Sequence, residues 1–171
     1  MADILTVFFL FLIFFKLINN QVIFLAQYHI ESWSGKGVVR NYGSPDTTSP
    51  DPFPIFWNGT IAVTTLPIYD FSLFIPDAVV INLGTNDYST QPAPSQQQFE
   101  QGYKQFIQSI RTQYTQAVPI FLACGPMISD PCCTYVQNVV ASENNCHFIN
   151  LQNILTSDEY GVSVIFLLNN F

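Results

Sequence analysis

The stretch that decides the fold spans residues 76–87 and reads PDAVVINLGTND. Its centre is apolar except for Asn82, which is typical of a strand buried on both faces of a parallel sheet. Gly84 ends this strand, and Asn86 and Asp87 follow it in a tight turn. Ligands of open α/β sheets bind at the carboxyl ends of the strands, so the stretch also indicates where to look for a functional site.

Helix and strand patterns alternate around this strand. Ser95 and Gln98 have the spacing of a capping box, and the apolar residues after them keep helical spacing. The expected elements, in chain order, are a strand at 27–32, the strand at 78–83, a helix from Ser95 through Tyr114, a strand at 118–124, a helix from Asp130-Pro131 to Asn144, and a strand at 147–151. This alternation predicts a three-layer α/β/α domain with a mostly parallel sheet.

The composition excludes several classes of protein. The 171 residues suffice for one domain with a core, and 49% apolar and 10% charged residues make the chain too hydrophobic for intrinsic disorder. A net charge of -7 leaves no basic surface for phosphates, so nucleic acid is not an expected partner. Metal-ligand spacings and nucleotide fingerprints are absent from the sequence, so we expect neither a metal nor another cofactor.

The first 26 residues form a hydrophobic segment with two open interpretations. Residues 4–15 are apolar except for Thr6, but Lys16 and later amides make a membrane-spanning helix marginal, and Asp3 with no early Lys or Arg is unusual for a signal peptide. The segment is either a signal or membrane anchor, or translated A/T-rich non-coding DNA. The resulting division is a hydrophobic segment at 1–26, a domain at 27–161 and an atypical apolar tail at 162–171.

Four cysteines, at positions 124, 132, 133 and 146, permit two disulfides. Vicinal cysteines rarely pair, so we expect Cys132 or Cys133 to reach Cys146, with Cys124 buried as a small hydrophobe. A sequon at Asn58 agrees with a secretory route. Together with the hydrophobic first segment, it leads us to expect a protein that is secreted or membrane-anchored.

Two blocks of the chain resemble the SGNH (GDSL-type) esterases. Residues 76–87 look like the third conserved block of that superfamily. Residues 34–37 (SGKG) and 40–43 (RNYG) look like the second block of its carbohydrate acetyl esterase branch, carbohydrate esterase family 2. The resemblance spans residues 28–160 and implies a flavodoxin-like sheet. It also implies deacetylation of an acetylated sugar or polysaccharide, which would be the partner of this chain.

The resemblance also implies roles for particular residues. It makes Gly35 and Asn86 the oxyanion donors, and a glycine N–H with a side-chain amide in one crevice is chemically suited to that task. Gly84 and Asp87 would support them by shaping the turn.

The chain departs from the family where the family has its nucleophile and its base. The nucleophile is a serine in a Gly-Asp-Ser block on the first strand, yet residues 1–27 contain no serine. The base is a histidine in an Asp-x-x-His segment, and residues 162–164 stand in its place. His29 and His147 lie in expected strands and Ser34 in a loop, so we assign them structural roles.

The sequence therefore predicts a carbohydrate O-acetyl esterase relative that is inactive as it stands. The alternative is a non-catalytic carbohydrate-binding or interaction module, tethered to a membrane by residues 4–26.

Overall fold

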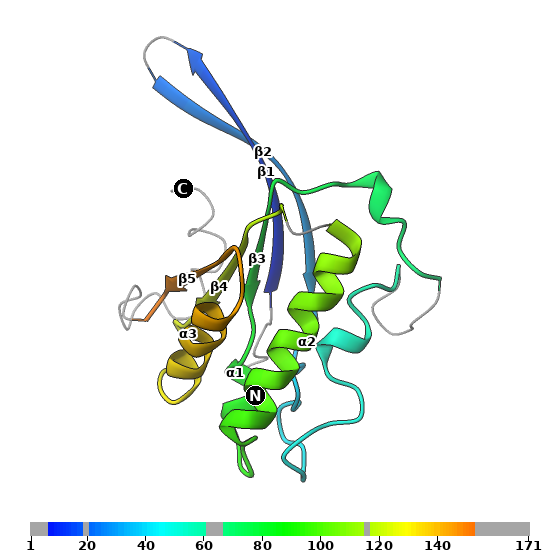
Figure 1. The fold of residues 1–171 in the computed structure, drawn as a ribbon, viewed down its shortest axis with the longest axis vertical. Helices are drawn as coiled ribbons and strands as arrows, with labels where there is room; N and C mark the ends of the chain where they lie inside the picture. The colour runs from blue at the N-terminus through cyan, green and yellow to red at the C-terminus, as the bar shows by residue number, and fades with distance from the viewer. Residues whose placement is uncertain (1–6, 19–20, 61–66, 115–116, 153–171) are drawn as a thin grey trace.

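The computed structural model describes residues 7–18, 21–60, 67–114 and 117–152. Its centre is a five-stranded sheet with the strand order β2-β1-β3-β4-β5 (Figure 1). The strands are β1 (Val7–Ile18), β2 (Gln21–Ser32), β3 (Ala78–Asn82), β4 (Ile120–Cys124) and β5 (Cys146–Asn150). The helices are α1 (Thr85–Tyr88), α2 (Gln96–Tyr114) and α3 (Cys132–Ser142), with short 3-10 turns η1 (Phe53–Ile55) and η2 (Phe71–Leu73).

One half of the sheet is parallel, which confirms the α/β class. β3 pairs with β4 and β4 with β5 in parallel, and α2 and α3 make the two crossovers. Such crossovers are nearly always right-handed. Because β3, β4 and β5 lie side by side in this order, both crossovers move in the same direction along the sheet, which places α2 and α3 on the same face. In agreement, α2 and α3 contact each other (Figure 1). Among the described residues, these two long helices thus form one layer on one face of the sheet.

The other half of the sheet is antiparallel, which the sequence did not predict. β1 pairs with both β2 and β3 in antiparallel register. Its pairs with β3 run from Val7 opposite Asn82 to Phe11 opposite Ala78. Beyond Phe11, β1 pairs only with β2, and this two-stranded ribbon extends past the rest of the sheet (Figure 1). An unbroken apolar run does not distinguish helix from strand, and its Phe, Ile and Val residues favour strands.

Within the hydrophobic segment at 1–26, residues 7–18 and 21–26 are strand rather than helix. Within the part of the chain that the structure describes, no helix has the length and hydrophobicity needed to cross a membrane. The expected strand at 27–32 is the end of a longer one, since β2 begins at Gln21.

The core lies between the parallel strands and the two long helices. It is formed by the buried faces of α2, α3, β3 and β4, among them Phe99, Tyr103, Phe106, Ile107 and Ile110, Val136 and Val139, Val79 and Ile81, and Ile120 and Leu122. These residues of α2 and α3 are those that the helical spacing in the sequence placed on one face.

The predicted start of α2 is confirmed, and that of α3 differs by one residue. The capping box at the start of α2 is confirmed, because the Ser95 N–H donates to Gln98 Oε1 at 2.9 Å and the Gln98 N–H donates to Ser95 Oγ at 3.2 Å. The predicted N-cap of α3 is wrong by one residue, since Pro131 occupies that position. Asp130 still satisfies a donor of the first turn, because its Oδ1 accepts the Thr134 N–H at 3.0 Å.

The expected disulfide to Cys146 is wrong. Cys124 is bonded to Cys133, and Cys132 and Cys146 are free and buried. Helix α3 runs back from the end of β4 toward the start of β5, and its 11 residues span about 16 Å. Cys133 lies in its first turn beside Cys124, whereas Cys146 begins β5 past the other end of the helix. The crossover therefore separates the two cysteines that the sequence spacing had paired.

This pairing can be tested with reductant. Closing a short loop in this way contributes about 2 to 4 kcal/mol to the free energy of unfolding in typical cases. We expect reductant to lower the stability of the wild-type chain by that amount in a denaturant titration, and to leave Cys124→Ser unaffected. Cys146→Ser should keep the full response to reductant. If Cys146→Ser lost the response, the bond would involve Cys146 instead.

Candidate active site

The turn after β3 brings two polar side chains into the interior. Gly84 begins the turn with φ +122°, and a Cβ there would lie 2.5 Å from Cys132 Sγ, so the position requires glycine. The short helix α1 follows at once and carries Asn86 and Asp87, both fully buried. The sequence predicted that these two side chains share one crevice, and the structure places them together under the loop that follows β2.

Asp87 holds that loop in place. Its carboxylate accepts three backbone N–H groups, from Val38 through Oδ2 and from Val39 and Arg40 through Oδ1, each at 2.9 Å. The loop lies so close that a Cβ at Gly37 would overlap the Arg40 carbonyl and the Asp87 carboxylate. Asp87 therefore fixes the glycine loop as well as its own turn.

Asn86 makes the second link between the two segments. Its Nδ2 donates to the Lys36 carbonyl at 2.7 Å, which places the amide directly beside the residue that follows Gly35. Gly35 has φ +80°, and the space where its Cβ would stand is open. In the described part of the chain no hydrogen bond engages the Gly35 N–H. The structure thus brings together the two residues, Gly35 and Asn86, that the resemblance selected as oxyanion donors.

Two buried cations, Lys36 and Arg40, stabilise the loop, and no pattern in the sequence indicated their burial. The guanidinium of Arg40 is completely buried and donates to the carbonyls of four residues. These are Ser44, Asp46, Asp87 and Thr90. The Lys36 ammonium donates to Asp51 Oδ2 at 2.6 Å, and this bond holds the pKa of Asp51 below its usual value. Both cations therefore shape the loop from within the chain.

The two histidines lie in strands of the sheet and contact neighbouring side chains. His29 lies in β2, with Nε2 3.2 Å from Glu31 Oε1 and its ring 5.1 Å from the ring of Tyr69. His147 is exposed in β5, and its ring lies 5.0 Å from that of Phe121. Ser34 is exposed in the loop beside Gly35. Residues 162–164, where the family's base would follow, lie outside the described residues.

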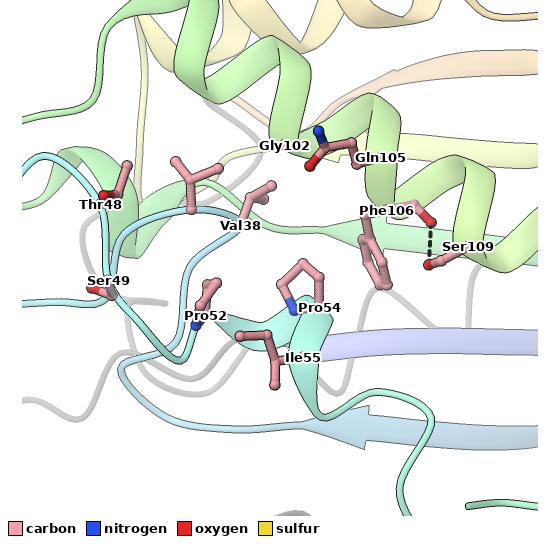
Figure 2. A pocket seen from close by; sticks show the side chains of 11 residues that line it. Val38, Thr48, Ser49, Pro52, Pro54, Ile55, Gly102, Gln105, Phe106 and Ser109 are labelled. Atoms are coloured by element: carbon pink, nitrogen blue, oxygen red, sulfur yellow. Dashed lines mark hydrogen bonds between the residues drawn. The ribbon is translucent and has the colours of Figure 1, made fainter. Parts of the chain in front are cut away.

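A cavity of about 380 Å³ adjoins the loop but not the two oxyanion candidates. Figure 2 shows its lining, which comes from the loop after Gly37 on one side and from α2 on the other. Val38, Pro52, Ile55 and Phe106 make most of this wall apolar, and no charged side chain lines it. It offers no group that could act on an ester, so the candidate site remains at Gly35 and Asn86.

The environment of Asp87 changes its titration. Burial raises its pKa from 3.8 to about 6, and the three N–H donors, which favour the charged form, offset only part of this effect. The folded state therefore takes up a proton at a higher pH than the unfolded state does. Protonation of Asp87 therefore favours the folded state. Its contribution to the free energy of unfolding is complete below pH 3.8 and is lost as the pH rises through 6.

Asp87→Asn tests both the bonds and the titration. An amide can accept at only one of its two heavy atoms, so a buried N–H is left unpaired and we expect a loss of about 1 to 3 kcal/mol at pH 7. Asp77→Asn, at an exposed position before β3, should change stability little. Denaturant titrations from pH 7 to pH 4 should show the wild type gaining stability relative to Asp87→Asn. A constant difference across this range would contradict the raised pKa.

Comparison with known sequences confirms the resemblance. The chain is 38% identical over 131 residues to the cellulase/esterase CelE of Acetivibrio thermocellus, a match that covers 71% of this chain and 14% of CelE. It is 27% identical over 106 residues to an acetylxylan esterase / glucomannan deacetylase of Cellvibrio japonicus, covering 61% of this chain and 28% of that protein. The chain thus spans less than a third of the length of these curated relatives. No protein-family model matches it.

Solved structures point the same way. A family two carbohydrate esterase from Clostridium thermocellum in complex with cellohexaose matches with a TM-score of 0.61 and 32% identity, covering 70% of this chain and 38% of that one. A family two carbohydrate esterase from Cellvibrio japonicus matches in fold with a TM-score of 0.56 and 22% identity, covering 69% and 36%. In both sequence and fold, the chain therefore shares its central part with the SGNH-type carbohydrate esterases.

Proposed function

We propose that this chain is part of a carbohydrate O-acetyl esterase, in which the Gly35 N–H and the Asn86 amide stabilise the oxyanion. The hydrogen bond from Asn86 Nδ2 to the Lys36 carbonyl carries this proposal, because it joins the two segments that must act on one oxygen. The similarity to acetylxylan esterases supports the choice of an acetylated sugar or polysaccharide as substrate.

The chemistry of ester hydrolysis explains why these groups matter. Attack on the acetyl carbonyl moves a negative charge onto its oxygen, and each fixed donor aimed at that oxygen contributes about 2.7 to 4 kcal/mol in comparable enzymes. Gly35 offers a backbone N–H, and the space where its Cβ would stand is open. Asn86 is held rigidly by its bond to Lys36, so its amide requires little rearrangement during the reaction.

We also propose that this chain lacks the nucleophile and the base that the family uses. His29 and His147 make the contacts described above, Ser34 is exposed in the loop, and residues 1–27 contain no serine. We therefore expect the 171-residue chain by itself to lack esterase turnover. Binding of a polysaccharide without hydrolysis is the second candidate function, favoured by the cellohexaose bound to the solved relative.

A secretory route also belongs to the proposal. The bond between Cys124 and Cys133 requires an oxidising compartment to form and persist, which supports a protein that is secreted or membrane-anchored.

The activity test compares the chain with a completed enzyme. An acetylated oligosaccharide should not be turned over by the 171-residue chain. Adding a Gly-Asp-Ser strand before the domain and an Asp-x-x-His segment after it should produce deacetylation. In that completed enzyme, Asn86→Ala should lower kcat by about a hundred- to a thousandfold with little change in KM, because the amide acts on transition-state charge.

Asn138→Ala is the matched control, since Asn138 is exposed on α3 and its loss should leave kcat unchanged. Enzyme-like turnover by the unmodified chain, abolished by Ser34→Ala, would contradict the proposal and place the nucleophile at Ser34.

A further inference from the structure

A second cavity, of about 290 Å³, lies beside β2 and away from the oxyanion candidates. This volume is at the small end of the range of ligand sites, which suits one small molecule or one chemical group of a larger one. Its walls are unusually aromatic. The residues that define it chemically are Glu31, Trp33, Phe53, Phe56, Trp57 and Tyr69.

The cavity contains one acidic group. Glu31 lies near the end of β2, Trp33 follows the last residue of that strand, and both line the cavity. The Glu31 side chain is 20% exposed, and its Oε1 lies 3.2 Å from Nε2 of His29. Burial raises the pKa of Glu31 to about 8 and lowers that of His29. The carboxyl group is thus short of a cation, and a positive charge placed in the cavity would stabilise its ionised form.

The aromatic rings are of the kind that accept an ammonium group. The rings of Trp33 and Phe56 lie 4.9 Å apart. The Lys36 ammonium already sits 4.7 Å from the centre of Trp33 and 5.2 Å from that of Phe56. Asp51 balances the charge of Lys36, and Lys36 is not part of the cavity wall. Trp33 and Phe56 also line the cavity, together with the carboxyl group of Glu31.

We propose that this cavity binds a small organic cation, of the quaternary or methylated ammonium class. Several rings facing a carboxylate give such a cation both cation–π attraction and a counter-charge. The cavity is lined by one carboxyl group, that of Glu31, beside these rings, and this group offers a counter-charge to a cation but none to a neutral sugar. This site is separate from Gly35 and Asn86, so it does not depend on the esterase proposal.

The chain carries a built-in probe for the experiment. It has two tryptophans, Trp33 and Trp57, and both line the cavity. Titrating the full chain with choline should therefore change its tryptophan fluorescence in a saturable manner. 3,3-Dimethylbutan-1-ol has the same shape without the charge, and we expect it to bind about tenfold more weakly or not at all.

Substitution of Glu31 tests the counter-charge. Glu31→Gln should weaken choline binding by about tenfold or more, because the cation loses the carboxylate but keeps the rings. Asp77→Asn removes an exposed carboxylate outside the cavity and should leave the affinity unchanged. Equal binding of choline and its neutral analogue, or binding of methyl glucoside in place of choline, would overturn the proposal, as would the absence of any saturable change.

A pH series on the wild type does not depend on whether Glu31→Gln folds. Glu31 must release its proton to pair with the cation, so choline should bind about tenfold more tightly at pH 9 than at pH 7. The groups facing Glu31 are His29 on the same strand, Tyr69, and Tyr114 of α2. His29 stays neutral over this range because its pKa is lowered, and Tyr114 stays neutral because its pKa is raised. An affinity that does not change with pH would contradict pairing with Glu31.

Discussion

The candidate site depends on one buried carboxylate. Asp87 accepts the N–H groups of Val38, Val39 and Arg40, and so joins the turn after β3 to the loop after β2. These segments lie about fifty positions apart in the sequence. Without an acceptor, three buried N–H groups would each lose a hydrogen bond, at a typical cost of about 1 to 3 kcal/mol. The geometry that brings Asn86 to the Lys36 carbonyl follows from this connection.

The parts of the fold that local sequence determines could be predicted. The capping box of α2 is formed by residues three apart, and the short apolar stretch that ends at Gly84 has the length and composition of a strand. Asn86 and Asp87 were found because a turn after such a strand faces the carboxyl edge of the sheet. Each of these inferences needs only neighbouring residues or one general rule of α/β topology.

The parts that tertiary structure determines could not be predicted. The partner of Cys133 depends on which end of α3 faces which strand, and spacing along the chain misassigned it to Cys146. The antiparallel pairing of β1 follows from no periodic pattern, since its sequence is apolar except for Lys16. The burial of Arg40 depends on four carbonyl groups, and those of Asp87 and Thr90 lie about fifty positions away along the chain. These features arise from contacts between segments that carry no shared sequence signal.

The most direct test of this account measures the three amides that Asp87 binds. Hydrogen–deuterium exchange, read by NMR, should show the N–H groups of Val38, Val39 and Arg40 protected in the wild type and much faster in Asp87→Ala, while the amides of β4 stay protected in both. If the three loop amides exchanged at the same rate in the two proteins, Asp87 would not hold the glycine loop, and the account of the site would be contradicted.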